Sequence, residues 1–217
     1  GGMMLHLLEL EDCPENRTVS LQQYNVVDNP ATSYATLRGA LTLVRNGQPD
    51  PWIAERCNAG EPVTLNSCNL ENVDAIQLPA HCKTVITSEN AAPFHELLSE
   101  NPEAVLLYTG GYPNAVVCRL LGLLGEAGAV CKHWGDSDPD GLLIAALINR
   151  YIDTTLFRCN LDEVLRHPND LIPLKGGSVQ LGKSLLKTHP GFKFRNELEF
   201  TVQTNHWLEQ ERWTPAD

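Results

Sequence analysis

Short apolar segments alternate with helix-like segments from Lys83 onwards, and this alternation restricts the fold more than any other feature of the sequence. Apolar and β-branched runs predict four short strands, at residues 84–87, 104–108, 129–133 and 154–157. Between them the pattern predicts helices, at residues 93–98, 113–126 and 142–151. Strands joined by helices of this length form βαβ units, which build a parallel sheet with helices on both faces. We therefore expect an α/β domain over residues 81–217, with a Rossmann-like parallel sheet of about four strands.

Residues 1–80 have a different pattern, and we expect them to form a small, mixed lead-in region that contains strands. Strands are predicted at residues 18–21 and 40–45, and the second of these ends at the turn-forming pair Asn46-Gly47. This region contains no clear chemical motif. We therefore expect the function to reside in the following domain.

The composition is that of an ordinary globular protein of the cytoplasm, with a hydrophobic content of 42%. No apolar run approaches the roughly 20 residues that cross a bilayer, so no membrane association is expected. The seven cysteines are an odd number and form no Cys-x-x-Cys pair, which argues against a zinc or disulfide framework. Mostly buried, free thiols in a reducing compartment are expected instead.

Acidic or glycine residues directly follow three of the predicted strands. In strand order they are Glu89, the pair Gly110-Gly111, and the three carboxylates Asp136, Asp138 and Asp140. Functional groups gather beyond the carboxyl ends of the strands in a parallel α/β sheet, so these residues are expected at one edge. Three carboxylates at alternate positions after an apolar strand concentrate negative charge that packing alone does not explain. A hard divalent cation, Mg²⁺ or Mn²⁺, would balance that charge, so the sequence predicts a metal site and phosphate chemistry.

Other interpretations of the acidic loop fit less well. Its spacing begins like that of an EF-hand, but Pro139 stands at loop position four and Leu147 stands where a bidentate Glu is required. A haloacid-dehalogenase-type phosphotransferase would carry Thr or Val at the position of Asp140. Helix capping by Asp136 and Asp140 explains one or two of the carboxylates, but not Asp138 as well. Capping and turn chemistry therefore stay open beside the metal site.

One segment of this otherwise acidic chain is basic. The net charge is −11, which disfavours affinity for a polyanion because such affinity comes largely from phosphate neutralisation. Residues 171–195 carry five cations and no carboxylate, which leaves −16 on the rest of the chain. The five cations are Lys175, Lys183, Lys187, Lys193 and Arg195. They form either a strip that faces DNA or an ordinary solvated surface.

A Glu after the first strand, Gly after the second and Asp-x-Asp after the third together resemble the Toprim domain. This domain is the catalytic module of type IA and type II topoisomerases, bacterial-type primases and several nucleases. Four segments are also similar to the C-terminal Toprim part of the JetD family, at residues 85–90, 109–113, 133–141 and 208–211. JetD proteins are the nuclease subunits of the Wadjet anti-plasmid defence system, and their Toprim domain is akin to that of the topoisomerase VI A subunit. The resemblance covers about residues 83–212.

The resemblance implies magnesium-dependent cleavage of double-stranded DNA. Glu89, Asp136 and Asp138 would be the catalytic residues and would hold one or two Mg²⁺ or Mn²⁺ ions, which stabilise developing charge and help to form the attacking hydroxide. Further candidate metal ligands are Asp140, Glu209 and Glu211. The five cations of residues 171–195 would contact the DNA.

The resemblance also implies partners: SMC-like complex subunits, and a second copy of the chain, because paired cutting of a duplex favours a homodimer. JetD-like proteins carry a large N-terminal region that binds DNA and dimerises, and 217 residues do not accommodate it. The chain is therefore expected to be a fragment of a longer protein or a minimal relative.

Two other functions remain open. The first is a non-catalytic, metal-stabilised interaction module of a DNA-processing complex, in which the same carboxylates would be retained. The second is a phosphotransferase or phosphatase that uses Asp136 as its nucleophile and forms a covalent aspartyl intermediate.

Overall fold

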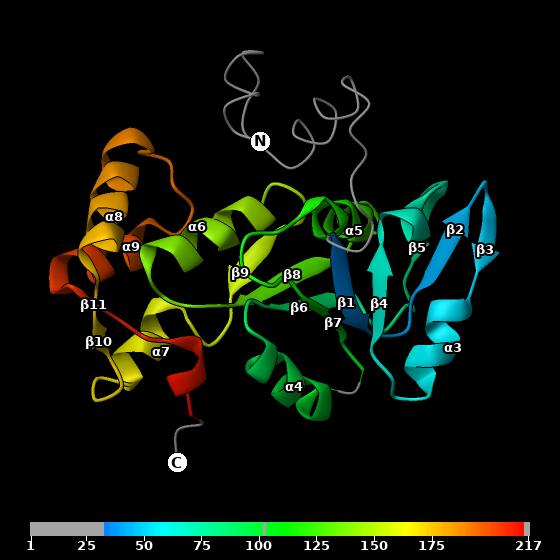
Figure 1. Cartoon of the computed structure of the whole chain (residues 1–217), viewed down its shortest axis with the longest axis horizontal. Coiled ribbons are helices and arrows are strands. Elements are labelled where there is room, and N and C mark those ends of the chain that lie inside the picture. Colours follow the sequence, from blue (N-terminus) through cyan, green and yellow to red (C-terminus); the bar gives the residue numbers. More distant parts are fainter. Residues whose placement is uncertain (1–32, 102, 215–217) are drawn as a thin grey trace.

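The computed structural model describes residues 33–101 and 103–214, and a six-stranded mixed sheet is their central element (Figure 1). Across the sheet the strands are β4 (Val63–Asn66), β1 (Tyr34–Arg38), β7 (Val105–Tyr108), β6 (Thr84–Ser88), β8 (Val130–Trp134) and β9 (Thr154–Leu156). The four strands β7, β6, β8 and β9 are parallel, and β1 and β4 extend the sheet in antiparallel pairing. The predicted α/β fold with a parallel core of four strands is confirmed, and the complete sheet is wider and mixed.

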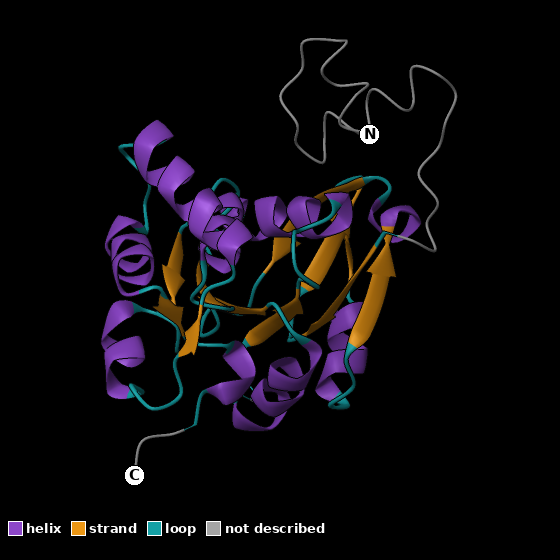
Figure 2. Ribbon diagram, turned by 60° about the vertical axis from the view of Figure 1, so that its left-hand side comes forward, coloured by secondary structure: helices purple, strands orange, loops and turns teal. Residues whose placement is uncertain are grey.

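Helices cover both faces of the main sheet (Figure 2). One face carries α5 (Ala115–Glu126) and α6 (Pro139–Ile148), and the other carries α4 (Ala91–Glu100). Side chains alternate along each strand, so Val85 packs in the cluster on the α5 side whereas Ile86 packs with α4. Because both faces of the sheet are buried, apolar residues occupy successive positions of each strand, and the strand sequences are continuous apolar runs.

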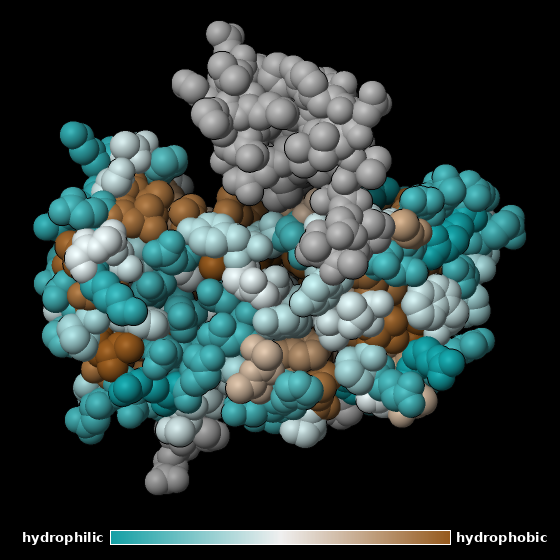
Figure 3. All heavy atoms as spheres, in the orientation of Figure 1, coloured by the Kyte–Doolittle hydropathy of each residue, from teal (hydrophilic) through white to brown (hydrophobic). Residues whose placement is uncertain are grey.

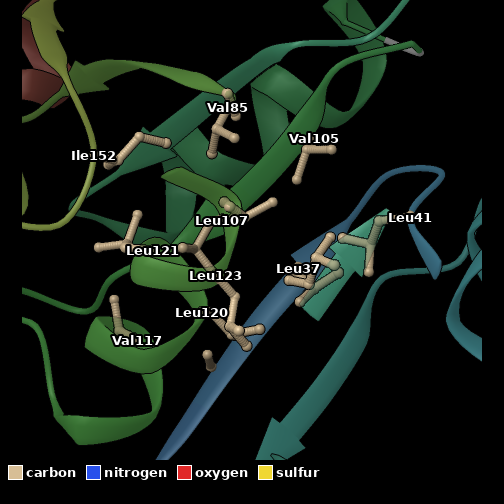
Figure 4. Close-up of a cluster of buried hydrophobic side chains, with 14 of the residues drawn as sticks. Leu37, Leu41, Val85, Val105, Leu107, Val117, Leu120, Leu121, Leu123 and Ile152 are labelled. Atoms are coloured by element: carbon tan, nitrogen blue, oxygen red, sulfur yellow. The ribbon is translucent and has the colours of Figure 1, made fainter. Parts of the chain in front are cut away.

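The larger apolar cluster joins the parallel strands to α5 and to β1 (Figure 4). Leu107 of β7, Leu121 of α5 and Leu37 of β1 belong to it, and each is at most 1% exposed. Burying one such leucine contributes roughly 1.5–3 kcal/mol to stability. The core therefore fixes where the strands lie and where their carboxyl ends emerge.

Two helix starts differ from the sequence prediction because a polar residue caps each helix. Asn114 accepts hydrogen bonds from the backbone N–H groups of Val116 and Val117, so α5 begins after the cap and not at residue 113. Asp138 is the N-cap of α6, and Pro139 occupies its first position, so this helix begins three residues earlier than predicted.

A smaller antiparallel sheet lies at one end of the molecule, at the right of Figure 1. It is formed by β2 (Thr42–Arg45), β3 (Gln48–Asp50) and β5 (Val73–Gln77), next to α3 (Trp52–Asn58), and the 3₁₀ turn η1 (Ser67–Leu70) precedes β5. Asn46 and Gly47 have positive φ angles of 48° and 74°, as the predicted hairpin turn requires. The strand predicted at residues 18–21 lies outside the described residues. Residues before 80 thus contribute this sheet and also β1 and β4 of the main sheet.

The chain beyond β9 forms a helical group at the opposite end and then returns to the main sheet (Figure 1). Its elements are α7 (Leu161–Arg166), β10 (Ile172–Pro173), α8 (Gly176–Thr188), α9 (Arg195–Thr204), β11 (His206–Trp207) and the 3₁₀ turn η2 (Gln210–Arg212). The helices α8 and α9 pack on α6, and η2 contacts α4. The return of η2 brings residues of the C-terminal segment to the carboxyl edge of the parallel strands.

The face of the molecule seen in Figure 3 is mostly hydrophilic, with hydrophobic residues in small separate patches. Among the described helices, none has the length and apolar character that crossing a bilayer would require. Of the cysteines, Cys57, Cys82, Cys131 and Cys159 are buried thiols without a disulfide, and Cys68 is an exposed one.

Candidate metal site at the carboxyl edge of the sheet

Glu89 and Asp136 lie together at the carboxyl ends of two neighbouring parallel strands. Ser88, the last residue of β6, pairs with Trp134, the last residue of β8. The backbone N–H of Glu89 donates to the Trp134 carbonyl at 3.0 Å, and the Asp136 N–H approaches Glu89 Oε2 at 3.4 Å. Residues separated by 47 positions in the sequence are therefore in contact through their strand ends.

Asp138 and Asp140 occupy the start of α6. Asp138 Oδ1 accepts a hydrogen bond from the Gly141 N–H at 2.8 Å, so this residue caps the helix. Asp140 is in the first turn, where Tyr112 donates its hydroxyl to Oδ1 at 2.9 Å. The alternative to metal binding, in which Asp136 and Asp140 cap this helix, is wrong in its residues because Asp138 is the cap.

Two glycines allow the backbone to pack closely around Asp136. A Cβ on Gly141 would collide with the Asp136 carbonyl oxygen, so the start of α6 can approach this loop only with glycine. A Cβ on Gly135 would lie 2.7 Å from Glu89 Oε2 and 2.7 Å from His133 Nε2. Both distances are too short for a real Cβ atom, so glycine at 135 keeps a small space open beside Glu89.

The acidic loop is fixed by the C-terminal segment through Ser137, which is buried. Ser137 donates its N–H to the Leu208 carbonyl at 3.0 Å, and Leu208 donates its N–H to the Ser137 hydroxyl at 2.7 Å. The Thr201 hydroxyl of α9 donates to the Ser137 carbonyl at 3.1 Å. The backbone between Asp136 and Asp138 is therefore held from two sides.

Gln210 joins the ends of β6 and β8, and it is only 2% exposed. Its Nε2 group donates to Ser88 Oγ at 2.8 Å and to the Trp134 carbonyl at 3.0 Å. Its Oε1 accepts from the Asn90 N–H at 3.0 Å, and its own backbone N–H donates to Asp136 Oδ1 at 2.8 Å. The sequence does not reveal this residue, because its neighbours Glu209 and Glu211 carry the charge that suggests ligands.

Those two glutamates have different positions relative to the site. Glu211 is exposed, accepts a hydrogen bond from Asn90 Nδ2 at 3.2 Å, and its negative charge adds to the raised pKa values of Glu89 and Asp136. Glu209 instead forms an ion pair with Arg212 at 3.2 Å. Of the two second-rank candidates in this segment, the structure brings Glu211 to the acidic cluster.

Burial and mutual repulsion make the cluster hard to ionise fully. Burial raises the pKa of Glu89 to about 7, and the charges of Asp138 and Glu211 add to this effect. Burial likewise raises the pKa of Asp136 to about 7, with Glu89 and Asp138 contributing. Burial also raises the pKa of Asp138, against the positive charge of Lys175. A cation bound among these groups would favour their charged forms.

The donor set fits a hard divalent cation in its chemistry, because it consists of carboxylate oxygens from adjacent strand ends. Within residues 33–101 and 103–214, no three His, Cys, Asp or Glu side chains are already arranged as a set of metal ligands. The backbone brings the carboxylates to the same edge of the sheet. To bind an ion, their side chains would have to turn toward one another.

The five predicted DNA-contacting cations have different local partners. Lys175 stands at the N-cap of α8, where its charge acts on Asp138. Lys193 contacts Asp153 at 2.7 Å and Asn149 at 2.6 Å, and Arg195 pairs with Glu199 at 2.7 Å. The remaining two, both exposed on α8, are Lys183 and Lys187.

The loop after β7 completes this edge. Gly110 and Gly111 have φ angles of 67° and 83°, a region that residues other than glycine seldom adopt. They turn the chain toward Tyr112, a residue that is 51% exposed and contacts Asp140. A cleft of about 210 Å³ lies beside this loop, lined by Tyr34, Tyr108, Thr109, Gly110 and Asn114.

The fold and this edge define a class: an α/β protein with a group of partly buried carboxylates beyond the carboxyl ends of its parallel strands. The chain belongs to the family described as "Protein of unknown function C-terminus (DUF2399)", whose profile matches residues 63–198. The matched segment contains Glu89, Asp136 and Asp138, whereas Gln210 and Glu211 lie beyond it. No curated protein shows significant similarity to the sequence.

Proposed function

We propose that this protein is a divalent-metal-dependent endonuclease that hydrolyses phosphodiester bonds of double-stranded DNA. The observation that carries the proposal is the contact between Glu89 and Asp136 on adjacent parallel strand ends, with Asp138 following at the start of α6. Three carboxylates with raised pKa values in one place are unfavourable without a counter-charge. Phosphodiester hydrolysis uses such groups to hold cations against a phosphate.

In this proposal, Glu89, Asp136 and Asp138 would hold Mg²⁺ or Mn²⁺. The ion would neutralise charge on the scissile phosphate and lower the pKa of an attacking water. Gln210 keeps the two strand ends at a fixed separation, and Ser137 keeps the acidic loop against the C-terminal segment. The movement needed for binding is then limited to carboxylate side chains, which makes the loss of conformational entropy small.

The acidic surroundings make the cation essential for approach of the DNA. With a net charge of −11, the chain repels phosphate, and the carboxylate cluster adds to this repulsion where the scissile bond must lie. Lys175 is the cation of residues 171–195 whose charge acts on the cluster, so it is the one that we expect to contact a phosphate near the cut.

We further propose that the domain is of the Toprim type and acts as the nuclease part of a plasmid-restricting complex with SMC-like subunits, as a homodimer on the duplex. The supporting pattern is Glu after β6, Gly after β7 and Asp-x-Asp after β8, with β6 between the other two strands in the sheet. Cutting of both DNA strands by a pair of such sites would give linear products.

Conversion of supercoiled plasmid by the purified protein tests the proposal, with Mg²⁺, with Mn²⁺ and with a chelator. We expect cation-dependent nicking or linearisation that is lost in Glu89→Gln and Asp136→Asn. Glu96→Gln is the matched control, because it removes the same charge from an exposed position on α4. Equal cutting by all variants would contradict the assigned site.

Two further outcomes would replace the proposal by its alternatives. Binding of Mn²⁺ without cleavage of DNA, alone or with partner subunits, would identify a metal-stabilised interaction module. Turnover of a small phosphate ester through a covalent intermediate on Asp136 would identify a phosphotransferase.

A further inference from the structure

His133 has one buried nitrogen atom that the fold leaves without a partner. The residue lies in β8 and is 1% exposed, and its Nδ1 atom is 2.8 Å from the Thr87 hydroxyl of the neighbouring strand β6. Its Nε2 atom is also buried and makes no hydrogen bond to any residue that the structure describes. An unsatisfied buried polar group lowers the stability of a folded protein, so such a group calls for an explanation.

The unpartnered nitrogen and the Glu89 carboxylate border the same small space. A Cβ on Gly135 would lie 2.7 Å from His133 Nε2 and 2.7 Å from Glu89 Oε2, so this space lies between the two groups and is too small for a carbon atom. Glycine at this position keeps that space free of side-chain atoms.

We propose that His133 is a positioning residue, whose Nε2–H group donates a hydrogen bond to the Glu89 carboxylate and holds it in the orientation that binds the cation. Nδ1 lies 2.8 Å from the Thr87 hydroxyl, a contact in which either atom can donate; in this proposal the hydroxyl donates, which places the ring proton on Nε2. Carboxylates that bind metal ions are themselves hydrogen-bonded by neighbouring groups, and loss of such a group weakens metal binding about 10–100-fold. This role rests on the proposed metal site.

A matched pair of substitutions separates positioning from simple packing. His133→Gln places an amide N–H near the position of Nε2, whereas His133→Asn keeps a polar atom near Nδ1 and has nothing at Nε2. Both replace a buried ring by a smaller amide, so both are expected to lower the melting temperature. Only the Asn variant should also lose the contact with Glu89.

The first measurement is Mn²⁺ affinity, by electron paramagnetic resonance on the folded wild type and both variants at pH 8. We expect affinity within about threefold of wild type for His133→Gln and a loss of about tenfold or more for His133→Asn. Equal affinity in all three proteins, or equal loss in both variants, would overturn the positioning role. Absence of Mn²⁺ binding to the wild type would instead contradict the proposed function, and the positioning role with it.

The second measurement needs no metal, so it tests the contact independently of the proposed function. In the ¹⁵N-resolved NMR spectrum of the metal-free protein, the Nε2–H signal of His133 should show a hydrogen-bonded proton. That signal should shift in Glu89→Ala and stay unchanged in the control Glu96→Ala. A signal that Glu89→Ala does not move would overturn the contact.

Discussion

Strand β6 passes from an apolar interior to a polar edge within a few residues. Val85 and Ile86 pack into apolar clusters on opposite faces of the sheet, and burial of their side chains stabilises the fold. Glu89, directly after the strand, lies among other carboxylates, and its pKa is raised to about 7 mainly by burial. Side chains in the interior of the sheet thus stabilise the fold, whereas the edge holds partly buried carboxylates whose ionisation lowers stability.

Hydrogen bonds to the backbone and to Gln210 maintain the edge despite this cost. Gln210 satisfies groups at the ends of both β6 and β8, and Ser137 ties the acidic loop to Leu208. An arrangement in which fixed backbone supports poorly stabilised charges is typical of functional sites. Substitutions in the interior and at the edge should therefore differ in both the size and the sign of their effects on the free energy of unfolding.

The largest effect on stability is expected in the interior. Leu121→Ala removes a fully buried side chain from the centre of the large cluster (Figure 4) and should lower the free energy of unfolding by about 2–5 kcal/mol. Urea unfolding with and without Mg²⁺ measures this, and the loss should be the same in both conditions. A loss that depended on Mg²⁺ would contradict the separation between core and edge.

The next effect is expected at the support of the edge. Gln210→Ala leaves the hydrogen-bonding groups of Ser88, Trp134 and Asn90 without their partner, and should lower stability by about 1–3 kcal/mol. It should also weaken Mn²⁺ binding, because the strand ends that carry the carboxylates lose their link. Gln203→Ala, at an exposed position of α9, is the matched control and should change neither quantity. Unaltered Mn²⁺ affinity in Gln210→Ala would show that the link has no role at the site.

Neutralising a carboxylate of the edge should instead raise the free energy of unfolding, because folding raises the pKa values of Glu89 and Asp136. Glu89 and Asp136 rise to about 7 from ordinary values of 4.5 and 3.8, so the folded protein binds more protons than the unfolded chain between those values. These two carboxylates should therefore lower metal-free stability as the pH rises from about 4 to about 8, whereas the lowered pKa of buried His133 acts in the opposite direction up to about pH 6.5. At pH 8, Glu89→Gln should raise the free energy of unfolding by about 1–3 kcal/mol.

Thermal unfolding from pH 4 to pH 8.5 measures this effect, with and without Mg²⁺. The ion should reduce the fall in stability for the wild type and have little effect on Glu89→Gln. A metal-free wild type whose stability does not fall relative to that of Glu89→Gln over this range would contradict the raised pKa of Glu89.

The smallest effect is expected at the basic segment. Lys175→Ala should reduce the slope of log affinity for duplex DNA against log salt by about 1, because one phosphate contact is lost. Lys193→Ala should change the slope less, because Lys193 already pairs with Asp153. Fluorescence anisotropy at several salt concentrations measures both slopes, and equal slopes for Lys175→Ala and the wild type would remove Lys175 from the interface.

The parallel core and the meeting of Glu89 with Asp136 could be predicted from the sequence, because strand ends of a βαβ sheet share one edge. The antiparallel addition of β1 and β4 could not, since the short segment from Tyr34 to Arg38 carries no distinctive pattern. Asp138 as the cap of α6 could not be separated from its neighbours by spacing alone.

The supporting groups of the site depend on contacts that no local pattern encodes. Gln210 reaches Ser88 across 122 positions of the chain, so its role follows only from the return of the C-terminal segment. Lys193 and Arg195 belong to the same basic run in the sequence, but Lys193 pairs with the distant Asp153, whereas Arg195 pairs with Glu199 one turn along α9. Side chains that look alike in a charge pattern thus differ in their partners.

Anomalous diffraction from crystals soaked in Mn²⁺ tests the central claim most directly. We predict an anomalous peak that marks Mn²⁺ bound by carboxylate oxygens of Glu89 and Asp136, with Asp138 beside it. The peak should be present in the wild type and absent in Asp136→Asn. A wild-type crystal with Mn²⁺ bound elsewhere, and none at this edge, would contradict the account.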